Sequence, residues 1–565
     1  MSALPVKPNE LSITGSFNQE SRVRGQEAGD RNQESVIKNA VLAVITFCAA
    51  AFNASGALFQ YTVPADTNER PAYLWIPPQA KLVRGVVLAG STLMEEHFVQ
   101  DEQIRAACSA ESLAIIYLTR GLGGLDVQPI LDACAEISGY SEIAHAPLLF
   151  VGHSANGPPA QQLAARMGER CFGLIQYRGG MPSGDSPIPA GIPSVAMMAQ
   201  FDEFWGTMRN EEGFESWERA LNYIRGFRAA GADNLGSFLV EPGAGHFAWS
   251  DRNAAYLAKF ITKAAQARIP EQWEITPSAP PELLTIDHTT GWLTGFDLKG
   301  ETEIAAFTDY LGDKADTSWH FDEGMARAAM EYHKGLTGLK DQFIRWQDPH
   351  WVDAGARFFF TRLTWVEDGQ TLKVHPVYAD EYPSQYNGQG PRWPQAGEPA
   401  GHSSAPIQVR PVAGPLVATG PDTFRFQYSA LSPAGSRARV TFLAYREGDE
   451  EYRYTEQVGM MPRGFNGLNR GRNQTITFES LADIPANSPP LKLEATSDAD
   501  VTVEYYVAYG PAVIENGQLK ISGIPPRATF PIEVKVVACH FGSGVEPEIR
   551  TAEPVERVFN ITAAE

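Results

Sequence analysis

The sequence predicts an α/β domain, with a mostly parallel sheet and helices on both of its faces, followed by an α+β connector region and an all-β sandwich domain. Three observations support this prediction. Near-continuous apolar runs alternate with helix-like stretches over 59–267, the pattern of a parallel sheet covered on both sides. Prolines then mark a change of character over 270–300. From about residue 407 onward, short alternating strand patterns separated by turns fill the chain.

The α/β domain is assigned to residues 58–270. Its predicted strands are the apolar runs 73–76 (YLWI), 85–90 (GVVLAG), 113–118 (LAIIYL), 147–152 (PLLFVG), 172–177 (FGLIQY), 194–201 (SVAMMAQF) and 236–241 (GSFLVE). Its predicted helices are 100–111, 125–139, 155–166, 214–231 and 251–267. We expect the two earliest runs to form an antiparallel edge of the otherwise mostly parallel sheet.

Residues 271–405 are assigned to the connector. It includes a helix-like stretch, DEGMARAAMEYHKGL, and a strand-like stretch at 356–365 (ARFFFTRLTW). Residues 380–415 are dense in Pro, Gly and Ser, which is typical of a linker or of long loops.

Residues 406–565 are assigned to the β-sandwich. The predicted strands are FRFQYSA, ARVTFLAYR, QTITFE, LKLEAT, VTVEYYVAYG and IEVKVVACH. Helical periodicity is absent between them, which favours an antiparallel sandwich with an immunoglobulin-like arrangement.

Length and charge exclude some classes of protein. The chain has 565 residues, enough for two to four domains at about 100–200 residues each. Its 46 Lys and Arg against 67 Asp and Glu give a formal charge of −21. A surface this acidic repels phosphate backbones, so nucleic acid is not an expected partner.

The first 57 residues form a polar leader and a signal-like segment. Lys38 precedes the apolar run 40–52, and small residues follow as far as Ala57. This is the layout of a secretory signal, with cleavage expected after Ala57. The run is shorter than the roughly 20 apolar residues of a membrane-spanning helix. We therefore expect export to the periplasm or the medium, with membrane tethering if the segment is not cleaved; a buried helix at the start of the fold is the alternative.

The cysteines predict no metal or redox centre. Cys48 lies in the signal-like segment, and Cys108, Cys134, Cys171 and Cys539 show no Cys-x-x-Cys spacing. Cys108 and Cys134 fall on two predicted helices. They could form a disulfide after export or remain buried free thiols, and the sequence does not decide between these alternatives. No histidine spacing indicates a metal, and no cofactor is expected.

A serine lies where the strand 147–152 turns into a helix, in the sequence Gly152-His153-Ser154-Ala155-Asn156-Gly157. This segment resembles the G-x-S-x-G nucleophile elbow of the α/β-hydrolase superfamily, with Asn156 where the family usually has glycine. The resemblance implies an α/β-hydrolase fold, Ser154 as nucleophile and the amide of Ala155 as one oxyanion donor. The hydrolase portion is broadly similar to dienelactone hydrolases, feruloyl esterases and polyester depolymerases.

Two further residues follow later strands in the order of that family. The strand 194–201 runs into Asp202, with Glu203 as the neighbouring alternative acid, and the strand 236–241 is followed by the Gly-flanked His246. The order Ser154, Asp202, His246 matches Ser…Asp/Glu…His. Because each residue follows a separate strand, all three are expected at one edge of the sheet.

Other roles are assigned by position in the loops. The second oxyanion donor is expected near Ser91 or Thr92, although the family's His-Gly pair is absent there. His153 is expected either to have a structural role in the elbow or to form part of the substrate-binding pocket wall. Phe204, Trp205 and Trp249 are candidate substrate-binding aromatics, with core packing as the alternative.

These observations predict an exported serine carboxylesterase that acts on carbohydrate-linked or polymeric esters through an acyl-enzyme. Only a short segment separates the strand 172–177 from the next strand, so no cap domain is expected there, and an open site suits a bulky substrate. The partner is therefore a small-molecule or polymeric ester, and no stable membrane span is expected after processing. A serine peptidase with the same triad, or a surface or glycan-binding protein with a secondary hydrolase domain, remain alternatives.

Overall fold

The computed structural model describes residues 57–564, apart from 180–186, 203–216, 299–302, 347–358, 361–363, 383–396, 437–439 and 462–466. The signal-like segment, including the apolar run 40–52, therefore lies outside the described residues. Residues 56–565 cluster as one compact unit.

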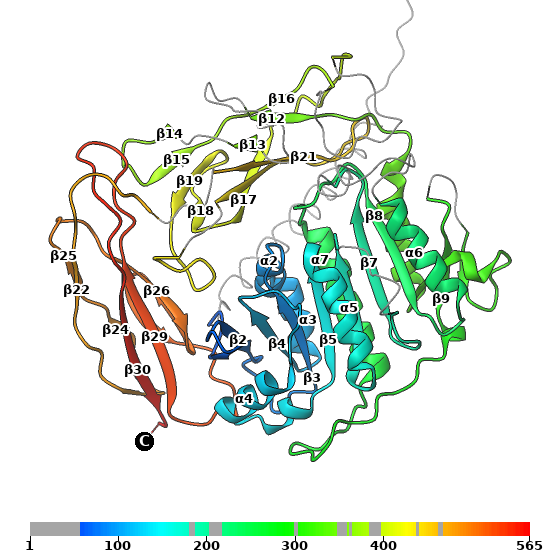
Figure 1. Cartoon of the computed structure of the whole chain (residues 1–565), viewed down its shortest axis with the longest axis horizontal. Helices are drawn as coiled ribbons and strands as arrows, with labels where there is room; N and C mark the ends of the chain where they lie inside the picture. Colours follow the sequence, from blue (N-terminus) through cyan, green and yellow to red (C-terminus); the bar gives the residue numbers. More distant parts are fainter. Residues whose placement is uncertain are drawn as a thin grey trace, which may run out of the picture. The chain divides into compact units, whose positions relative to one another are not determined.

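An eight-stranded sheet forms the first part of the fold (Figure 1). Its strands are β1 (Tyr61–Pro64), β2 (Pro71–Trp75), β3 (Gly85–Gly90), β4 (Leu113–Leu118), β5 (Leu148–His153), β6 (Cys171–Tyr177), β7 (Ser194–Ala199) and β8 (Gly236–Glu241). The order across the sheet is β1-β2-β4-β3-β5-β6-β7-β8. The six strands from β3 to β8 are parallel and buried along their whole length. This is the predicted α/β-hydrolase fold.

The predicted antiparallel edge is only partly right. β2 pairs antiparallel with β1 and with β4, whereas β3 lies inside the sheet and parallel to β4. The sequence analysis did not predict β1, because this strand has only four residues and only Tyr61 and Val63 among them are buried. Every residue of β3 is buried, and such a strand belongs in the interior of a sheet with helices on both faces.

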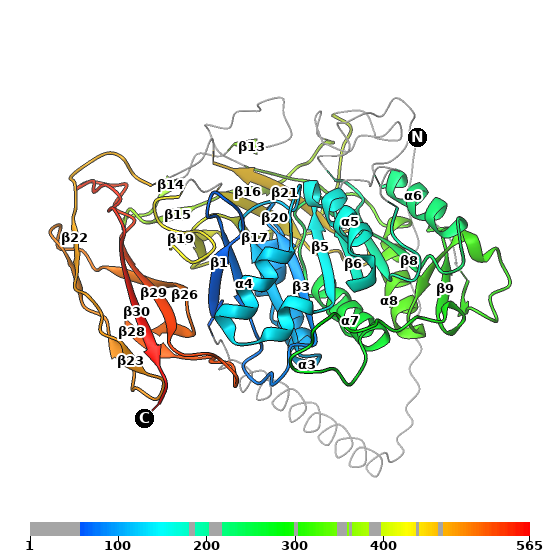
Figure 2. The same ribbon diagram turned by 60° about the horizontal axis from the view of Figure 1, so that its bottom comes forward.

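Helices cover both faces of the sheet (Figure 2). They are α2 (Glu95–Gln100), α3 (Glu102–Ala110), α4 (Gln128–Ser138), α5 (Gly157–Arg166), α6 (Glu218–Ala229) and α7 (Asp251–Arg268). Residues of α3 and α7 pack in one apolar core, and residues of α4 and α5 pack in the core on the opposite face. Alternate residues of each central strand point to the two cores, as the period of two requires.

The described cysteines are free and buried. Cys108 of α3 and Cys134 of α4 belong to the cores on opposite faces of the sheet, so no disulfide joins them. Burial raises the pKa of both thiols to about 12. Both are packing residues, because the nucleophilic thiolate is disfavoured there.

The connector folds against the β8 side of the sheet. It contains β9 (Trp292–Gly295), β10 (Ile304–Ala306), β11 (Thr317–His320) and α8 (Glu323–His333), which is the predicted helix. The three strands form a sheet in the order β10-β9-β11. Ser318 of β11 accepts a hydrogen bond from the amide of Phe238 in β8 at 2.9 Å, so this small sheet is fixed to the edge of the large one.

The remaining strands form several small, mostly antiparallel sheets. They are β12 (Ile344–Trp346), β13 (Phe359–Phe360), β14 (Thr364–Trp365), β15 (Thr371–Lys373), β16 (Pro376–Tyr378), β17 (Gln408–Ala413), β18 (Leu416–Ala418), β19 (Thr423–Phe426), β20 (Thr441–Arg446), β21 (Thr455–Met460), β22 (Ile476–Phe478), β23 (Ile484–Pro485), β24 (Leu491–Lys492), β25 (Ala495–Ser497), β26 (Glu504–Tyr509), β27 (Ala512–Glu515), β28 (Gln518–Ile521), β29 (Ile532–Cys539) and β30 (Val555–Thr562). The β structure predicted for this region is confirmed. It is divided among small sheets, and an immunoglobulin-like sandwich is not identified in it.

Strand pairing in this region crosses residue 405. β15 of the connector pairs with β19, and the sheet β13-β21-β20-β17 likewise joins strands from both sides of that residue. The sheet containing β17, β20 and β21 packs on the α/β domain, because Val412, Leu443 and Val458 belong to the same core as Phe98 of α2.

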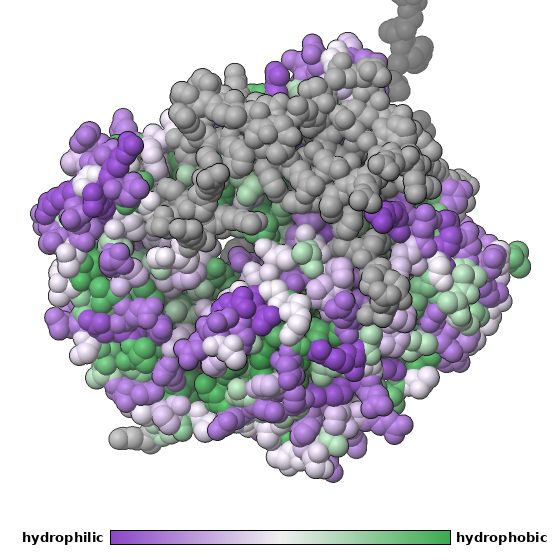
Figure 3. All heavy atoms as spheres, in the orientation of Figure 1, coloured by the Kyte–Doolittle hydropathy of each residue, from purple (hydrophilic) through white to green (hydrophobic). Residues whose placement is uncertain are grey.

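The described surface is mostly hydrophilic on the face drawn in Figure 3, with smaller apolar areas between the charged groups. Among the described residues, no helix has both the length and the apolar character needed to span a bilayer.

Candidate active site

The elbow at Ser154 has the backbone that its sequence predicts. β5 ends at His153, Ser154–Asn156 form one 3₁₀ turn, and α5 begins at Gly157. Ser154 has φ 52°, in the left-handed region that non-glycine residues rarely occupy. A Cβ on Gly152 would lie 2.3 Å from the carbonyl oxygen of Asn156. The turn is therefore tight enough to require glycine at 152 and to hold Ser154 in a strained conformation.

Asp202 and His246 form a buried hydrogen-bonded pair. Asp202 follows β7, and His246 lies in the loop between β8 and α7. His246 Nδ1 and Asp202 Oδ2 are 2.7 Å apart, and the residues are 1% and 0% exposed. Such a contact fixes the ring orientation and stabilises a cationic imidazole. Glu203, the alternative acid, lies outside the described residues.

The loops that carry the pair are bonded to each other. The amide of Gln200 donates to Glu241 O at 3.0 Å, and the amide of Phe201 donates to Ala244 O at 2.9 Å. Gln200 Oε1 also accepts a hydrogen bond from the amide of Gly243 at 2.8 Å. These bonds set the position of Asp202 relative to His246 through the backbone.

His153 links the elbow to the loop 242–250, which carries His246 and is called the histidine loop below. Its Nε2 lies 3.2 Å from the carbonyl oxygen of His246, and the centres of the two rings are 4.6 Å apart. Its Nδ1 lies 3.0 Å from Thr92 Oγ1. Burial, followed by the field of His246, holds the pKa of His153 well below its ordinary value. The ring is 1% exposed, so it supports the site as a neutral group behind the reacting atoms.

Glu95 is a buried acceptor that the sequence analysis missed. Its Oε1 accepts from the amide of His153 and from Asn156 Nδ2, both at 3.0 Å. Its Oε2 accepts from Thr92 Oγ1 at 2.7 Å and from the amides of Thr92 and Leu93 at 3.0 and 3.2 Å. Burial raises the pKa of Glu95. The signal in the sequence was the Thr-x-x-Glu spacing of Thr92 and Glu95, which is typical of a helix start.

Asn156 has a structural reason to replace the usual glycine of the elbow. Its Nδ2 donates to Gly90 O at 2.8 Å as well as to Glu95, and its Oδ1 accepts from the amide of Leu122 at 2.9 Å. The side chain thus joins the ends of β3, β4 and β5.

The oxyanion donors differ in availability. Ala155 is exposed in the first turn after β5, where amides lack an acceptor within the helix. By contrast, the amide of Ser91 donates to Leu118 O and Arg120 O at 2.9 Å, and the amide of Thr92 donates to Glu95. Neither amide is free for an oxyanion in this arrangement, because the buried Glu95 carboxylate and the end of β4 bind them.

Trp249 alone of the predicted binding aromatics lies within the described residues. Its ring packs edge-on against Phe98 and Tyr177, with centres 6.2 and 5.4 Å apart, and its Nε1 donates to Asp101 Oδ2 at 3.1 Å. The side chain is partly exposed. Phe204 and Trp205 lie outside the described residues.

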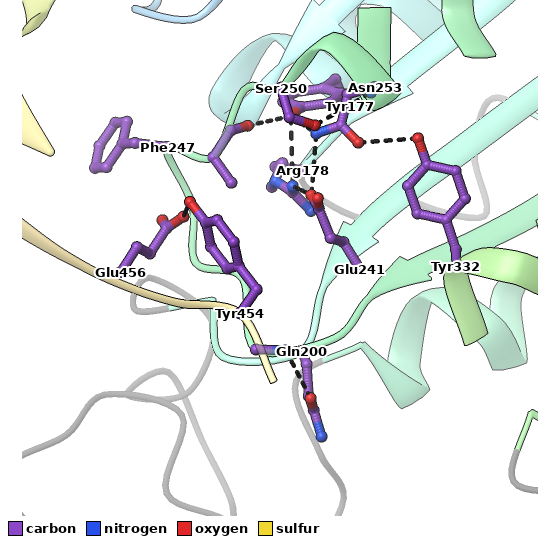
Figure 4. A network of polar contacts seen from close by, with 12 residues as sticks. Tyr177, Arg178, Gln200, Glu241, Phe247, Ser250, Asn253, Tyr332, Tyr454 and Glu456 are labelled. Atoms are coloured by element: carbon purple, nitrogen blue, oxygen red, sulfur yellow. Dashed lines mark hydrogen bonds and ion pairs between the residues drawn. The ribbon is translucent and has the colours of Figure 1, made fainter. Parts of the chain in front are cut away.

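A buried polar network contacts both ends of the histidine loop (Figure 4). Arg178 forms an ion pair with Glu241, and Tyr177 donates to Ala248 O. Asn253 Nδ2 donates to both Tyr177 Oη and Glu241 at 3.0 Å. Sequence patterns could not reveal this network, because its members come from β6, β8 and α7. It fixes the two ends of the loop that carries His246.

No family model and no curated protein matches the chain. Solved structures resemble part of it. The esterase domain of a Rhodothermus marinus protein shares 15% identity, with 36% of this chain and 96% of that chain covered and a TM-score of 0.25. Est1E from Butyrivibrio proteoclasticus shares 13%, with coverage of 37% and 97% and a TM-score of 0.25. A ferulic acid esterase shares 13%, with coverage of 36% and 99% and a TM-score of 0.28. This likeness concerns only the fold of the covered part.

In the described part of the chain, no group of three or more His, Cys, Asp or Glu side chains is placed to hold a metal ion.

Proposed function

We propose that this protein is a serine carboxylesterase, with Ser154 as nucleophile, His246 as base and Asp202 as the acid that orients it. The observation that best supports the proposal is the buried 2.7 Å contact between His246 Nδ1 and Asp202 Oδ2, combined with the strained φ of 52° at Ser154. Three separate strands bring these residues to one edge of the sheet, where such folds bind ligands.

The chemistry follows from these positions. With Nδ1 bonded to Asp202, His246 Nε2 is the nitrogen that takes the Ser154 proton as Oγ bonds to the ester carbonyl carbon. The imidazolium returns this proton to the leaving alkoxide as the C–O bond breaks, and the acyl group stays on Ser154. Water, deprotonated by His246, then attacks the acyl-enzyme and releases the acid and the free serine. The amide of Ala155 stabilises the oxyanion.

The proposed substrates are carbohydrate-linked or polymeric esters. The connection between β6 and β7, residues 178–193, is too short for a cap domain, which supports access by bulky substrates. The described chain also continues into several β-sheets, and the sheet of β17, β20 and β21 packs in the same core as Phe247 of the histidine loop.

The decisive test compares wild type and Ser154→Ala on p-nitrophenyl acetate and butyrate. We expect the substitution to lower kcat by several orders of magnitude, about 10³ or more. Ser109→Ala, a partly exposed serine of α3, is the matched control and should keep full activity. Equal, slow rates in wild type and Ser154→Ala would reject the esterase proposal.

We also propose that the protein is exported by the segment 40–52, with cleavage after Ala57, on the strength of the signal-like sequence. Intact-mass measurement of protein recovered outside the cytoplasm should give a chain that starts at Leu58. Recovery of the uncleaved chain in the membrane fraction would instead support tethering.

A further inference from the structure

A polar cleft of about 650 Å³ lies beside the histidine loop, where the α/β domain, α8 and the sheet of β17, β20 and β21 meet. Its volume is within the range of small-molecule sites. Neither Ser154 nor His246 lines it. Trp249 does, and it is three residues after His246 on the same loop. A ligand in the cleft would therefore touch the loop that carries the base without occupying the reacting atoms.

Aromatic faces form part of the cleft wall. Trp249 contributes from the α/β domain, and Tyr445 and Tyr454 contribute from the β-sheet side. The rings of Tyr445 and Tyr454 are stacked, with centres 6.3 Å apart and planes at 26°. All three side chains are partly exposed, so flat apolar surface is available to a ligand.

Charged groups of both signs lie among these rings. Carboxylates outnumber arginines in the lining, which holds the acids Asp101, Glu241, Asp251, Glu331, Glu447 and Asp449 and the bases Arg252, Arg410 and Arg453. Burial raises the pKa of Glu447, and the nearby Glu241 adds to the effect. The cleft thus offers hydrogen-bond donors and acceptors together.

This combination selects the chemistry of the ligand. An alkyl or lipid chain would remove exposed charged groups such as Glu447 from water without giving them a partner, which is costly. A polyanion would be repelled, because carboxylates outnumber arginines in the lining. A neutral saccharide fits, because its hydroxyl groups both donate and accept hydrogen bonds and its C–H faces stack on aromatic rings.

We propose that this cleft is a saccharide-binding subsite that holds sugar units of the substrate away from the ester under attack. The inference rests on the proposed function, since it gives the alcohol part of a carbohydrate-linked ester a place on the protein. It predicts that binding of free oligosaccharide and hydrolysis of a small synthetic ester are separable properties.

The test is calorimetric titration of the full chain carrying Ser154→Ala with unesterified xylohexaose, cellohexaose and mannohexaose. We expect at least one to bind with Kd of about 10 µM to 1 mM. Adding Tyr445→Ala to the Ser154→Ala chain should weaken that binding at least tenfold, whereas Tyr445→Phe should keep it. Glu447→Gln should weaken the binding less than Tyr445→Ala does. Tyr505→Ala, at a partly exposed tyrosine in the separate sheet of β26, should leave it unchanged.

In the background with Ser154 intact, Tyr445→Ala and Glu447→Gln should retain hydrolysis of p-nitrophenyl acetate, which also reports folding. The proposal is overturned if no hexasaccharide binds at about 5 mM, or if binding is the same with and without Tyr445→Ala. If p-nitrophenyl acetate is hydrolysed while all hexasaccharides fail to bind, the esterase stands and only the subsite is rejected.

Discussion

The residues of the candidate site divide into those that would react and those that hold them. His246 and Asp202 form a buried hydrogen-bonded pair, and Ser154 lies in the tight turn after β5, whereas Glu95, His153 and Asn156 are buried next to these residues. The supporting groups use their polar atoms on protein partners, so their replacement should affect the site through position. The two kinds of residue can therefore be distinguished by how activity and stability change together.

Asp202→Asn should lower kcat by about 10³–10⁴ with little change in KM, because an amide can hold the ring but favours the wrong tautomer and cannot stabilise its cation. Steady-state kinetics on p-nitrophenyl butyrate measure this effect. Asp233→Asn is the control, since Asp233 pairs with the partly exposed His288 on the surface. A loss below tenfold would move the role of the acid to another group.

Glu95→Gln should reduce both stability and activity. Both carboxylate oxygens of Glu95 accept hydrogen bonds from buried N–H and O–H groups. The amide of Gln has only one acceptor oxygen, and its NH₂ group would face donors that then lack an acceptor. Leaving buried donors unsatisfied costs about 1–3 kcal/mol each, so the free energy of unfolding should fall by roughly that amount in urea titrations. Unchanged stability and unchanged kcat would show that the elbow does not depend on this carboxylate.

At the scale of elements, the strand-turn-helix unit of β5, Ser154 and α5 depends on the absence of a side chain at Gly152. Gly152→Ala would place Cβ 2.3 Å from a backbone oxygen that cannot move without opening the turn. We expect loss of activity and of more than about 2 kcal/mol of stability. Gly226→Ala in α6 is the matched control: no atom lies within 4 Å of its added Cβ, and alanine should stabilise the helix by up to about 1 kcal/mol. Thermal unfolding and p-nitrophenyl acetate turnover on both variants decide the matter.

The elements also show how far the sequence predicts this protein. The buried strands β3 to β8 and the positions of Ser154, Asp202 and His246 could be predicted, because apolar runs and loop residues are local signals. The antiparallel edge could not, since β1 has four residues, of which only Tyr61 and Val63 are buried. The support by Glu95 depends on contacts with residues about 60 positions away, such as His153 and Asn156. The division of the C-terminal strands into small sheets depends on pairings that no local pattern encodes, such as β15 with β19.

At the scale of the whole molecule, the β-rich region takes part in positioning the candidate triad. Gln200 Oε1, two residues before Asp202, accepts from the amide of Gly243 in the histidine loop and from Arg453 Nη1 at 3.2 Å. Arg410 Nη2 donates to Phe247 O at 3.2 Å. A residue from the β region thus contacts the loop of the acid, and another contacts the loop of the base.

Arg453→Met should therefore lower kcat for p-nitrophenyl acetate by about tenfold, corresponding to roughly 1.4 kcal/mol, while KM changes little. Arg425→Met, which breaks an ion pair with Glu504 elsewhere in the β region, is the control and should keep full activity. Equal kinetics of both variants would show that the β region does not position the triad loops.

The contact between the β-rich region and the α/β domain should also make the free energy of unfolding depend on pH. Glu456 of β21 is 3% exposed, and burial raises its pKa to about 7, although Arg178, Tyr454 and Arg410 oppose the shift. Because the folded pKa lies above the unfolded one, the folded state binds the extra proton between about pH 4.5 and 7, and stability falls as pH rises through that window. Urea titrations from pH 4.5 to 8 should show this decline in wild type and a shallower one in Glu456→Gln, whose amide cannot ionise. If the two slopes are equal, the pKa of Glu456 is the same in the folded and unfolded protein, and the charge of Arg178 balances the burial of the carboxylate.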